Sequence, residues 1–170
     1  MHEFVQMAVG WLLEFGGPIL FVMLVLGIVG LPIPDETLLT LSGWLIAKGQ
    51  LNPVSTILFA IAGSVCGITI SYWLGRNTGT WLLKKYGPRF KFTEKRIQHV
   101  HRWYERIGKW SLLVGYFVPL VRHLTGYVAG SLQLTFKEFA IFAYAGALIW
   151  SLLFLALGYF LLIEILPSSF

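Results

Sequence analysis

Two adjacent carboxylates and, much later in the chain, one arginine interrupt stretches that are otherwise apolar. Asp35 and Glu36 follow Pro32 and Pro34 in the first stretch, and Arg122 follows a proline in the second. On an insertion scale a charged residue at the bilayer centre costs about 2.5 to 3.5 kcal/mol, so charges in such places usually mark a function. An acid can exchange a proton, and an arginine can bind an anion. We therefore treat these charged residues as candidates for transport chemistry.

The first stretch is predicted to be a helical hairpin that enters the membrane without crossing it. Residues 18–29 and 37–47 are apolar arms, and a dozen helical residues reach only about 20 Å, against a hydrocarbon core of about 30 Å. Pro32 and Pro34 disfavour helix in the residues before them, so the first arm is expected to end near Gly30. Broken backbone at this depth is tolerated only against protein or a water-filled cavity, which makes the proline tip a candidate site.

Helix capping is the alternative role for the acidic pair. Asp35 is a good N-cap for the helix that follows, and Glu36 in the first turn is favoured by the positive end of the helix dipole. Capping accounts for one acid at membrane depth but not for two. We therefore expect Asp35 to cap the helix and Glu36 to exchange the proton, with Asp35 as a second candidate for proton coupling.

The composition indicates the class of protein. The chain has 170 residues with a hydrophobic fraction of 56% and a mean hydropathy of +0.72, which predicts an all-α integral membrane protein of one domain. The single cysteine, Cys66, leaves no partner for a disulfide within the chain and no thiolate set for zinc. The four histidines do not cluster at ligand spacing. We therefore expect no metal and no cofactor.

The basic residues are concentrated in one segment. Ten of the thirteen Lys and Arg residues fall between Arg76 and Lys109, and the formal net charge is +5. This concentration is typical of a cytoplasmic loop in a membrane protein, so we expect no binding to nucleic acid. Residues 93–107 predict a basic amphipathic helix on the cytoplasmic surface, where anionic lipid would attract it. Its role is either orientation and anchoring or, as the alternative, lipid delivery.

The second interrupted stretch repeats the first with a charge of opposite sign. Residues 110–118 are again too short to span, Pro119 breaks the helix, and a second arm follows at 124–134. Polar or small residues at i, i+4, i+7 and i+11 begin at Glu36 in the first hairpin and at Arg122 in the second. The two hairpins therefore share a pattern, with opposite charges at their tips.

The fold class predicted from this order is an inverted repeat in which each half is a re-entrant helical hairpin followed by a transmembrane helix. Hairpins that enter from opposite sides would meet near the midplane. The expected parts are an N-terminal amphipathic interfacial helix (1–15), the first hairpin (16–50), a transmembrane helix (52–75), a cytoplasmic basic segment (76–109), the second hairpin (110–134) and a second transmembrane helix (136–164).

Tips that meet would bring Asp35 and Glu36 towards Arg122. A buried acid and a buried arginine satisfy each other's need for a partner. Protonation of the acid would then release the arginine to hold an anion. A permanent salt bridge that locks the hairpins is the alternative, although apolar residues could lock them without the desolvation cost.

Motifs spread over nearly the whole chain resemble those of a known family: Gly-Leu-Pro-Ile-Pro-Asp-Glu at 30–36, Tyr72-x-x-Gly75-Arg76-x-x-Gly79, and Phe117-x-Pro119-x-x-Arg122 followed by Ala129-Gly130 and Phe139. They look like the DedA family of bacterial membrane proteins, also called SNARE-associated or VTT-domain proteins. The resemblance implies paired re-entrant hairpins in a bacterial inner (plasma) membrane, crossed several times by the chain. It also implies movement of undecaprenyl phosphate or phosphatidylethanolamine between leaflets, dependent on the proton-motive force. By position, Glu36 matches the family's essential acid and Arg122 its second arginine.

The chain departs from the family pattern at several positions. Tyr116 stands where the family often has a first arginine, Ile68 where an aspartate often follows the glycine, Asp35 where a glycine is common, and Leu134 where a methionine is frequent. Asp35 would replace the lost acid. Tyr116 and His123 would join Arg122 in the substrate site.

The sequence therefore predicts a lipid translocase rather than an enzyme. The anionic head group of the lipid would pair with Arg122 while its tail stays in the bilayer, and Glu36 would couple the movement to protons. The partners are lipids with anionic head groups and protons, and a homo-oligomer is left open. A proton-coupled carrier of small ions or solutes is the alternative function. An enzyme acting on lipid phosphates is disfavoured, since the sequence has no metal cluster, nucleophile pair or histidine dyad.

Overall fold

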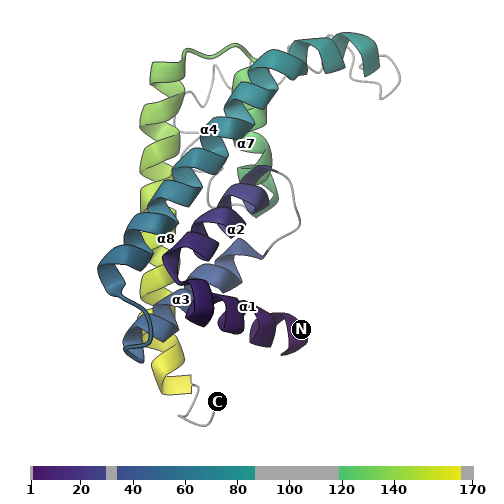
Figure 1. The fold of residues 1–170 in the computed structure, drawn as a ribbon. Helices are drawn as coiled ribbons and strands as arrows, with labels where there is room; N and C mark the ends of the chain where they lie inside the picture. The colour runs from purple at the N-terminus through teal and green to yellow at the C-terminus, as the bar shows by residue number, and fades with distance from the viewer. Residues whose placement is uncertain (1, 30–33, 87–118, 166–170) are drawn as a thin grey trace. The chain divides into compact units, whose positions relative to one another are not determined.

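The computed structural model describes residues 2–29, 34–86 and 119–165, and the regular structure in these ranges is entirely helical (Figure 1). The side chains of residues 2–5, 79–86, 119–124 and 161–165 are left undescribed. An all-α protein was predicted, and the described ranges confirm that class. The helices are α1 His2–Phe15, α2 Gly17–Val29, α3 Asp35–Ala47, α4 Pro53–Tyr86, α7 Pro119–Ser131 and α8 Phe136–Ile165.

Two helices are long and apolar enough to cross a bilayer. The qualifying segment of α4 is Pro53–Thr78, with a mean hydropathy of 1.9, and that of α8 is Phe136–Phe160, with a mean hydropathy of 2.2. Only 39% and 33% of an 18-residue apolar window in each segment are buried inside the protein. Large apolar side chains such as Leu58 (63% exposed) and Ile141 (59% exposed) face outward, as suits helices solvated by lipid.

The helix α4 is longer than the sequence analysis expected. A transmembrane helix over 52–75 was predicted, but α4 continues to Tyr86. No proline occurs between Arg76 and Tyr86, and Pro88 is the first after it, so nothing forces the helix to end with the apolar segment. The rest of the basic segment, including the helix predicted at 93–107, lies outside the described residues.

The chain divides into two compact units. The first unit is Met1–Gly67 with Ala147–Phe170, and the second is Ile68–Gly146. The first holds α1, α2 and α3 together with the beginning of α4 and the end of α8. The second holds α7 with the rest of α4 and the beginning of α8.

In the first unit, α2 is the central apolar helix. Leu20, Leu24 and Ile28 are fully buried along it at intervals of four residues, as a helix face requires. The helix α1 packs on α2 and α3. On the side of α4, a Cβ added at Gly63 would press on the backbone of Phe21, so glycine is needed for the close approach of these two helices.

The helix α3 follows α2 in the chain and also approaches the backbone of α8 closely. A Cβ at Gly43 would overlap the carbonyl oxygen of Leu155, and a Cβ at Gly158 would overlap the carbonyl oxygen of Thr40. Small residues at a helix interface permit this kind of contact. The hydroxyl groups of the fully buried Ser64 and Ser151 lie 3.1 Å apart and join α4 to α8 in the same unit.

In the second unit, α7 packs on α4 in a similar way. A Cβ at Gly75 would overlap the carbonyl oxygen of Tyr127, and one at Gly130 would overlap the carbonyl oxygen of Tyr72. The buried ring of Tyr72 also stacks on Phe139 of α8, with 4.4 Å between the ring centroids. These contacts hold α7 against α4 and join α4 to α8.

The helices α3 and α7 end with the same hydrogen-bonded turn. After α3, the N–H of Gly49 donates to Ile46 and that of Gln50 to Leu45. After α7, the N–H of Gln133 donates to Gly130 and that of Leu134 to Ala129. This is the pattern of the Schellman motif, in which one residue adopts a left-handed conformation. Gly49 has φ +70°, and Gln133, although it is not glycine, has φ +57°.

The helix boundaries at the two predicted hairpins agree with expectation in the first hairpin and differ in the second. The helix α2 ends at Val29 and α3 begins at Asp35, close to the predicted break. By contrast, α7 already begins at Pro119, where a break was expected up to residue 123. Proline is favourable at the first helical position because its missing N–H would have no partner there. Insertion of either hairpin without crossing the membrane remains a prediction.

Candidate functional site

Asp35 is the buried acid of the first unit. It is the first residue of α3, and its side chain is fully buried. The expectation that Asp35 caps the helix is wrong, because Pro34 occupies the N-cap position and no side-chain cap hydrogen bond forms there. Both acids do lie in the first turn, where the positive end of the helix dipole favours them.

The Asp35 carboxylate occupies a space that Gly27 of α2 leaves free. A Cβ added at Gly27 would overlap Oδ1 of Asp35 and lie 2.7 Å from its Cγ. The carboxylate is therefore held directly against the backbone of an apolar helix. Sequence reasoning missed Gly27, although a glycine inside the apolar arm just before the acidic pair could have indicated a space for one of the acids.

Glu36 is in a more open position than Asp35. Its side chain is half-buried, and its backbone carbonyl accepts a hydrogen bond of 2.6 Å from the Thr40 hydroxyl. Successive residues are about 100° apart around a helix, so when Asp35 faces Gly27, Glu36 projects in another direction. The structure thus gives the two acids different environments, one fully buried and one half-buried.

The other residues expected in the site belong to the second unit or lie where no description is given. Arg122 and His123 lie near the start of α7, as its fourth and fifth residues, but the placement of their side chains is outside what the structure describes. The positions of Tyr116 and Pro32 are outside it altogether. A pairing of Glu36 with Arg122 therefore stays a prediction.

A second cluster of polar groups, which the sequence analysis quoted only as part of a motif, lies where α7 ends. The Nη1 atom of Arg76 donates to the hydroxyl oxygen of Tyr72 at 2.6 Å and to the carbonyl oxygen of Leu134 at 3.3 Å. The hydroxyl of Tyr72 itself donates to Leu134 at 2.5 Å. The carbonyl of Leu134 lies in the turn after α7, so these bonds tie that turn to α4.

The described residues contain no group of three or more His, Cys, Asp or Glu side chains that could hold a metal ion.

Comparisons with known proteins indicate one family. Residues 33–160 match the family model described as VTT domain. The chain is 41% identical over 145 residues to the uncharacterized membrane protein YbfM of Bacillus subtilis (strain 168), covering 85% of this chain and 90% of that protein. It is 25% identical over 158 residues to undecaprenyl phosphate transporter A of the same organism, covering 93% of this chain and 78% of that protein. It is 31% identical over 137 residues to protein DedA of Escherichia coli (strain K12), covering 79% of this chain and 62% of that protein. No solved structure matches the chain.

Proposed function

This chain belongs to the DedA, or VTT-domain, family of membrane proteins, and on that premise we propose that it is a lipid translocase. It moves a phosphate-bearing lipid, such as undecaprenyl phosphate or phosphatidylethanolamine, between the leaflets of the bacterial inner membrane and depends on the proton-motive force. One relative, of 25% identity, is named as a transporter of undecaprenyl phosphate, which supports a transport role.

The observation that carries the proposal is the acidic pair at the start of α3. Asp35 is fully buried against Gly27 of an apolar helix, and Glu36 beside it is half-buried. Burial of a carboxylate among apolar helices is unfavourable unless the group is paired or protonated. In proteins that span membranes, acids in such places serve in proton relays and substrate pathways.

The contacts of the glycines support an inverted repeat. Gly43 of α3 lies against the carbonyl of Leu155 on α8, and Gly130 of α7 lies against the carbonyl of Tyr72 on α4. Each second arm thus packs on the long helix that belongs to the other half of the chain. The helices α3 and α7 also have the same length of 13 residues. Transporters built from inverted repeats form their sites where such discontinuous helices meet.

In the proposed mechanism Arg122 binds the phosphate of the lipid. A guanidinium stays charged and can hold two phosphate oxygens at once. His123 and Tyr116 line the same site, and the lipid tail remains in the bilayer throughout. Glu36 pairs with Arg122 while it is ionised, and uptake of a proton by Glu36 frees the guanidinium for the head group.

The test is lipid movement by the purified protein in liposomes. We expect the wild type to expose fluorescent phosphatidylethanolamine or undecaprenyl phosphate to the opposite leaflet, and Arg122→Ala to slow this by about tenfold or more, since one charged hydrogen-bonding partner is lost. Lys137→Ala, which removes an exposed charge, is the matched control. Equal rates for wild type and Arg122→Ala would contradict the proposal. Flux of a small anion without lipid movement would favour the solute carrier instead.

A further inference from the structure

Arg76 lies where the apolar segment of α4 ends. The segment that can span a membrane runs from Pro53 to Thr78, so Arg76 sits in its last turn, which reaches the level of the lipid head groups when such a helix spans a bilayer. Its side chain is half-buried in the second unit. An arginine in this position reaches polar surroundings while its stem stays among apolar groups.

The guanidinium of Arg76 is fixed in place by its neighbours. Through Nη1 it donates to Tyr72 and to the carbonyl of Leu134, at 2.6 and 3.3 Å. Its Cζ also lies 5.8 Å from the ring centroid of Trp73 and 6.0 Å from that of Tyr72, within the range of attraction between a cation and an aromatic ring. A guanidinium held in this way loses little freedom when it binds a further group.

Among the groups that the structure describes, only part of the hydrogen-bonding capacity of Arg76 is used. A guanidinium has five N–H donors on three nitrogens, and the bonds to Tyr72 and Leu134 both come from Nη1. Within the described residues, neither Nε nor Nη2 donates a hydrogen bond, and no carboxylate forms an ion pair with Arg76. An arginine at membrane depth pairs with an opposite charge or with backbone carbonyls, and Arg76 makes the second kind of contact, to Leu134. The described protein supplies the fixed cation but not the anion.

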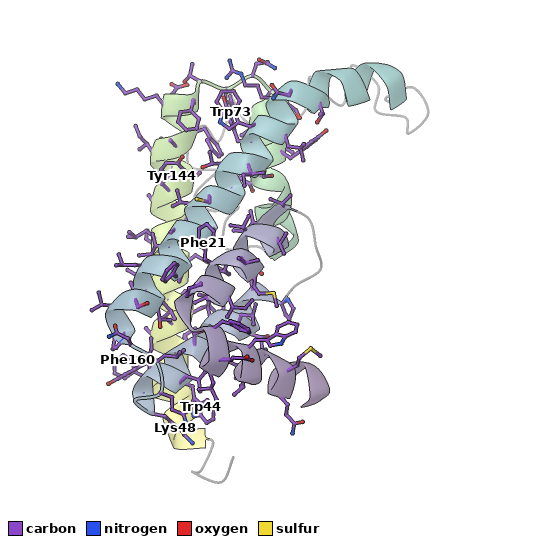
Figure 2. All side chains as sticks on the ribbon, in the orientation of Figure 1. Phe21, Trp44, Lys48, Trp73, Tyr144 and Phe160 are labelled. Atoms are coloured by element: carbon purple, nitrogen blue, oxygen red, sulfur yellow. The ribbon has the colours of Figure 1, made fainter. Side chains whose placement is uncertain are left out.

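The surroundings of Arg76 have the composition of a membrane interface. Trp73, labelled in Figure 2, is 46% exposed, and Phe136 is 39% exposed. Their rings stack with 6.1 Å between centroids. Exposed aromatic rings at the end of a spanning helix typically lie at the level of the lipid head groups. The anion available at that level is the phosphate of a lipid.

We infer that Arg76 is a second lipid site, at which the phosphate of a membrane lipid binds through Nε and Nη2 beside the Trp73 ring. The inference rests on the proposed function, because the site then receives the lipid before the head group reaches Arg122. The chemistry that it recognises is a phosphate oxygen, from either a monoester such as a polyprenyl phosphate or a diester such as a phospholipid. Arg76 raises the local concentration of substrate, and Arg122 determines the rate of movement.

Binding is tested on the full-length protein in detergent by native mass spectrometry with three probes. Dioleoyl phosphatidic acid offers a monoester, dioleoyl phosphatidylglycerol a diester, and dioleoylglycerol no phosphate. We expect Arg76→Gln to weaken binding of one or both phosphate lipids by about tenfold, the worth of one charged hydrogen bond, and to leave dioleoylglycerol unchanged. Loss of binding for the monoester alone assigns the site to lipids of the polyprenyl phosphate type. Loss of binding for both the monoester and the diester assigns it to lipid phosphate in general.

The variants separate lipid binding from the structural role of Arg76. The Tyr72 hydroxyl donates to the Leu134 carbonyl without the help of Arg76, so Arg76→Gln keeps one tie between α4 and the turn after α7 but removes the charge. Arg76→Lys keeps the charge and is expected to retain part of the binding even where Arg76→Gln fails to fold. Lys48→Gln is the matched control, because Lys48 is also a cation over an indole, 4.3 Å from the ring centroid of Trp44 (Figure 2).

Transport kinetics distinguish the two arginines. In liposomes with increasing amounts of the phosphate lipid, Arg76→Gln should raise the half-saturating lipid fraction by about tenfold with little change in the maximal rate. Unchanged phosphate-lipid binding in Arg76→Gln, or an equal loss of dioleoylglycerol, would overturn the inference. If the wild type moves no lipid, the proposed function fails, while the binding experiment still decides whether Arg76 is a phosphate site.

Discussion

Gly27 and Asp35 show how one missing side chain makes room for a charged one. The carboxylate lies where the Cβ of any other residue at position 27 would be. Gly27 is itself buried, inside a helix with no acidic or basic residue, so a displaced carboxylate would have to move away from α2. The position of the acid therefore depends on the absence of a side chain at position 27.

We predict that Gly27→Ala destabilises the protein by about 1 to 3 kcal/mol, the usual cost of overpacking a filled site. In an Asp35→Ala background the same change should cost much less, because the overlapping oxygens are gone. The measurement is unfolding of the purified protein in detergent for the wild type, both single variants and the double variant.

Gly10→Ala is the control for this double-mutant cycle of Gly27→Ala and Asp35→Ala. Gly10 is also within a helix, but a Cβ added there meets nothing within 4 Å. The change should be neutral or stabilising by up to about 1 kcal/mol, as expected for glycine to alanine in a helix. An equal cost for Gly27→Ala with and without the carboxylate would show that Asp35 is not the group it displaces.

The turns after α3 and α7 place the same strain on two different residues. Gly49 and Gln133 both have positive φ, but only glycine adopts that conformation without a steric cost. The left-handed conformation costs other residues about 1 to 2 kcal/mol. The first turn is therefore relaxed and the second strained, although their hydrogen bonds correspond.

We predict opposite effects for substitutions in the two turns. Gly49→Ala should destabilise the protein by about 1 kcal/mol through the backbone alone, since a Cβ at that position meets nothing within 4 Å. Gln133→Gly should be stabilising by up to about that amount, reduced by the loss of the 3.3 Å hydrogen bond from Gln133 to the carbonyl of Arg76. Unfolding in mixed micelles of detergent and SDS measures both, and effects of the same sign would contradict the interpretation.

Local signals predicted the elements better than their contacts. The prolines at 32 and 34 and the apolar arms beside them indicated where α2 ends and α3 begins. The start of α4 also agrees with a local signal, since Asn52 directly precedes Pro53 and its side chain accepts the N–H of Ser55 at 3.1 Å, as an N-cap does. These features depend on neighbouring residues only, so they can be inferred from one sequence.

Features that depend on the partner helix or on an ambiguous residue could not be predicted. Proline either ends a helix or begins one, and at Pro119 it begins α7. Glutamine carries no signal for positive φ, so the turn at Gln133 was not foreseen. The contact of Asp35 with Gly27 and that of Arg76 with the turn after α7 arise from packing between helices. Neither follows from residue spacing within one element.

At the scale of the whole molecule, the glycine contacts give a register for the proposed repeat. Gly43 and Thr40 of α3 contact α8, and Gly130 and Tyr127 of α7 contact α4. Gly130 follows Gly43 by the same number of residues as Tyr127 follows Thr40, so the two pairs occupy equivalent positions. Arg122 follows Asp35 by that same number. When α3 and α7 are aligned by these contacts, Asp35 is therefore the counterpart of Arg122. When they are aligned by the spacing of polar and small residues in the sequence, Glu36 is its counterpart. In an inverted repeat, corresponding residues lie on opposite sides of a two-fold axis.

The last prediction tests whether the two tips meet, as the transport mechanism requires. The exposed Cys66 is first replaced by serine, and cysteine is then introduced at position 122 together with position 36 or 35. We expect a short bifunctional thiol reagent to join 122 to both positions in membranes, since the two acids occupy the same turn of α3. Gln50, about 20 Å further along the chain at the helical rise, is the control position and should not be joined. Absence of the link from 36 would contradict the pairing of Glu36 with Arg122, and absence of a link from both 35 and 36 would show that the two tips do not meet.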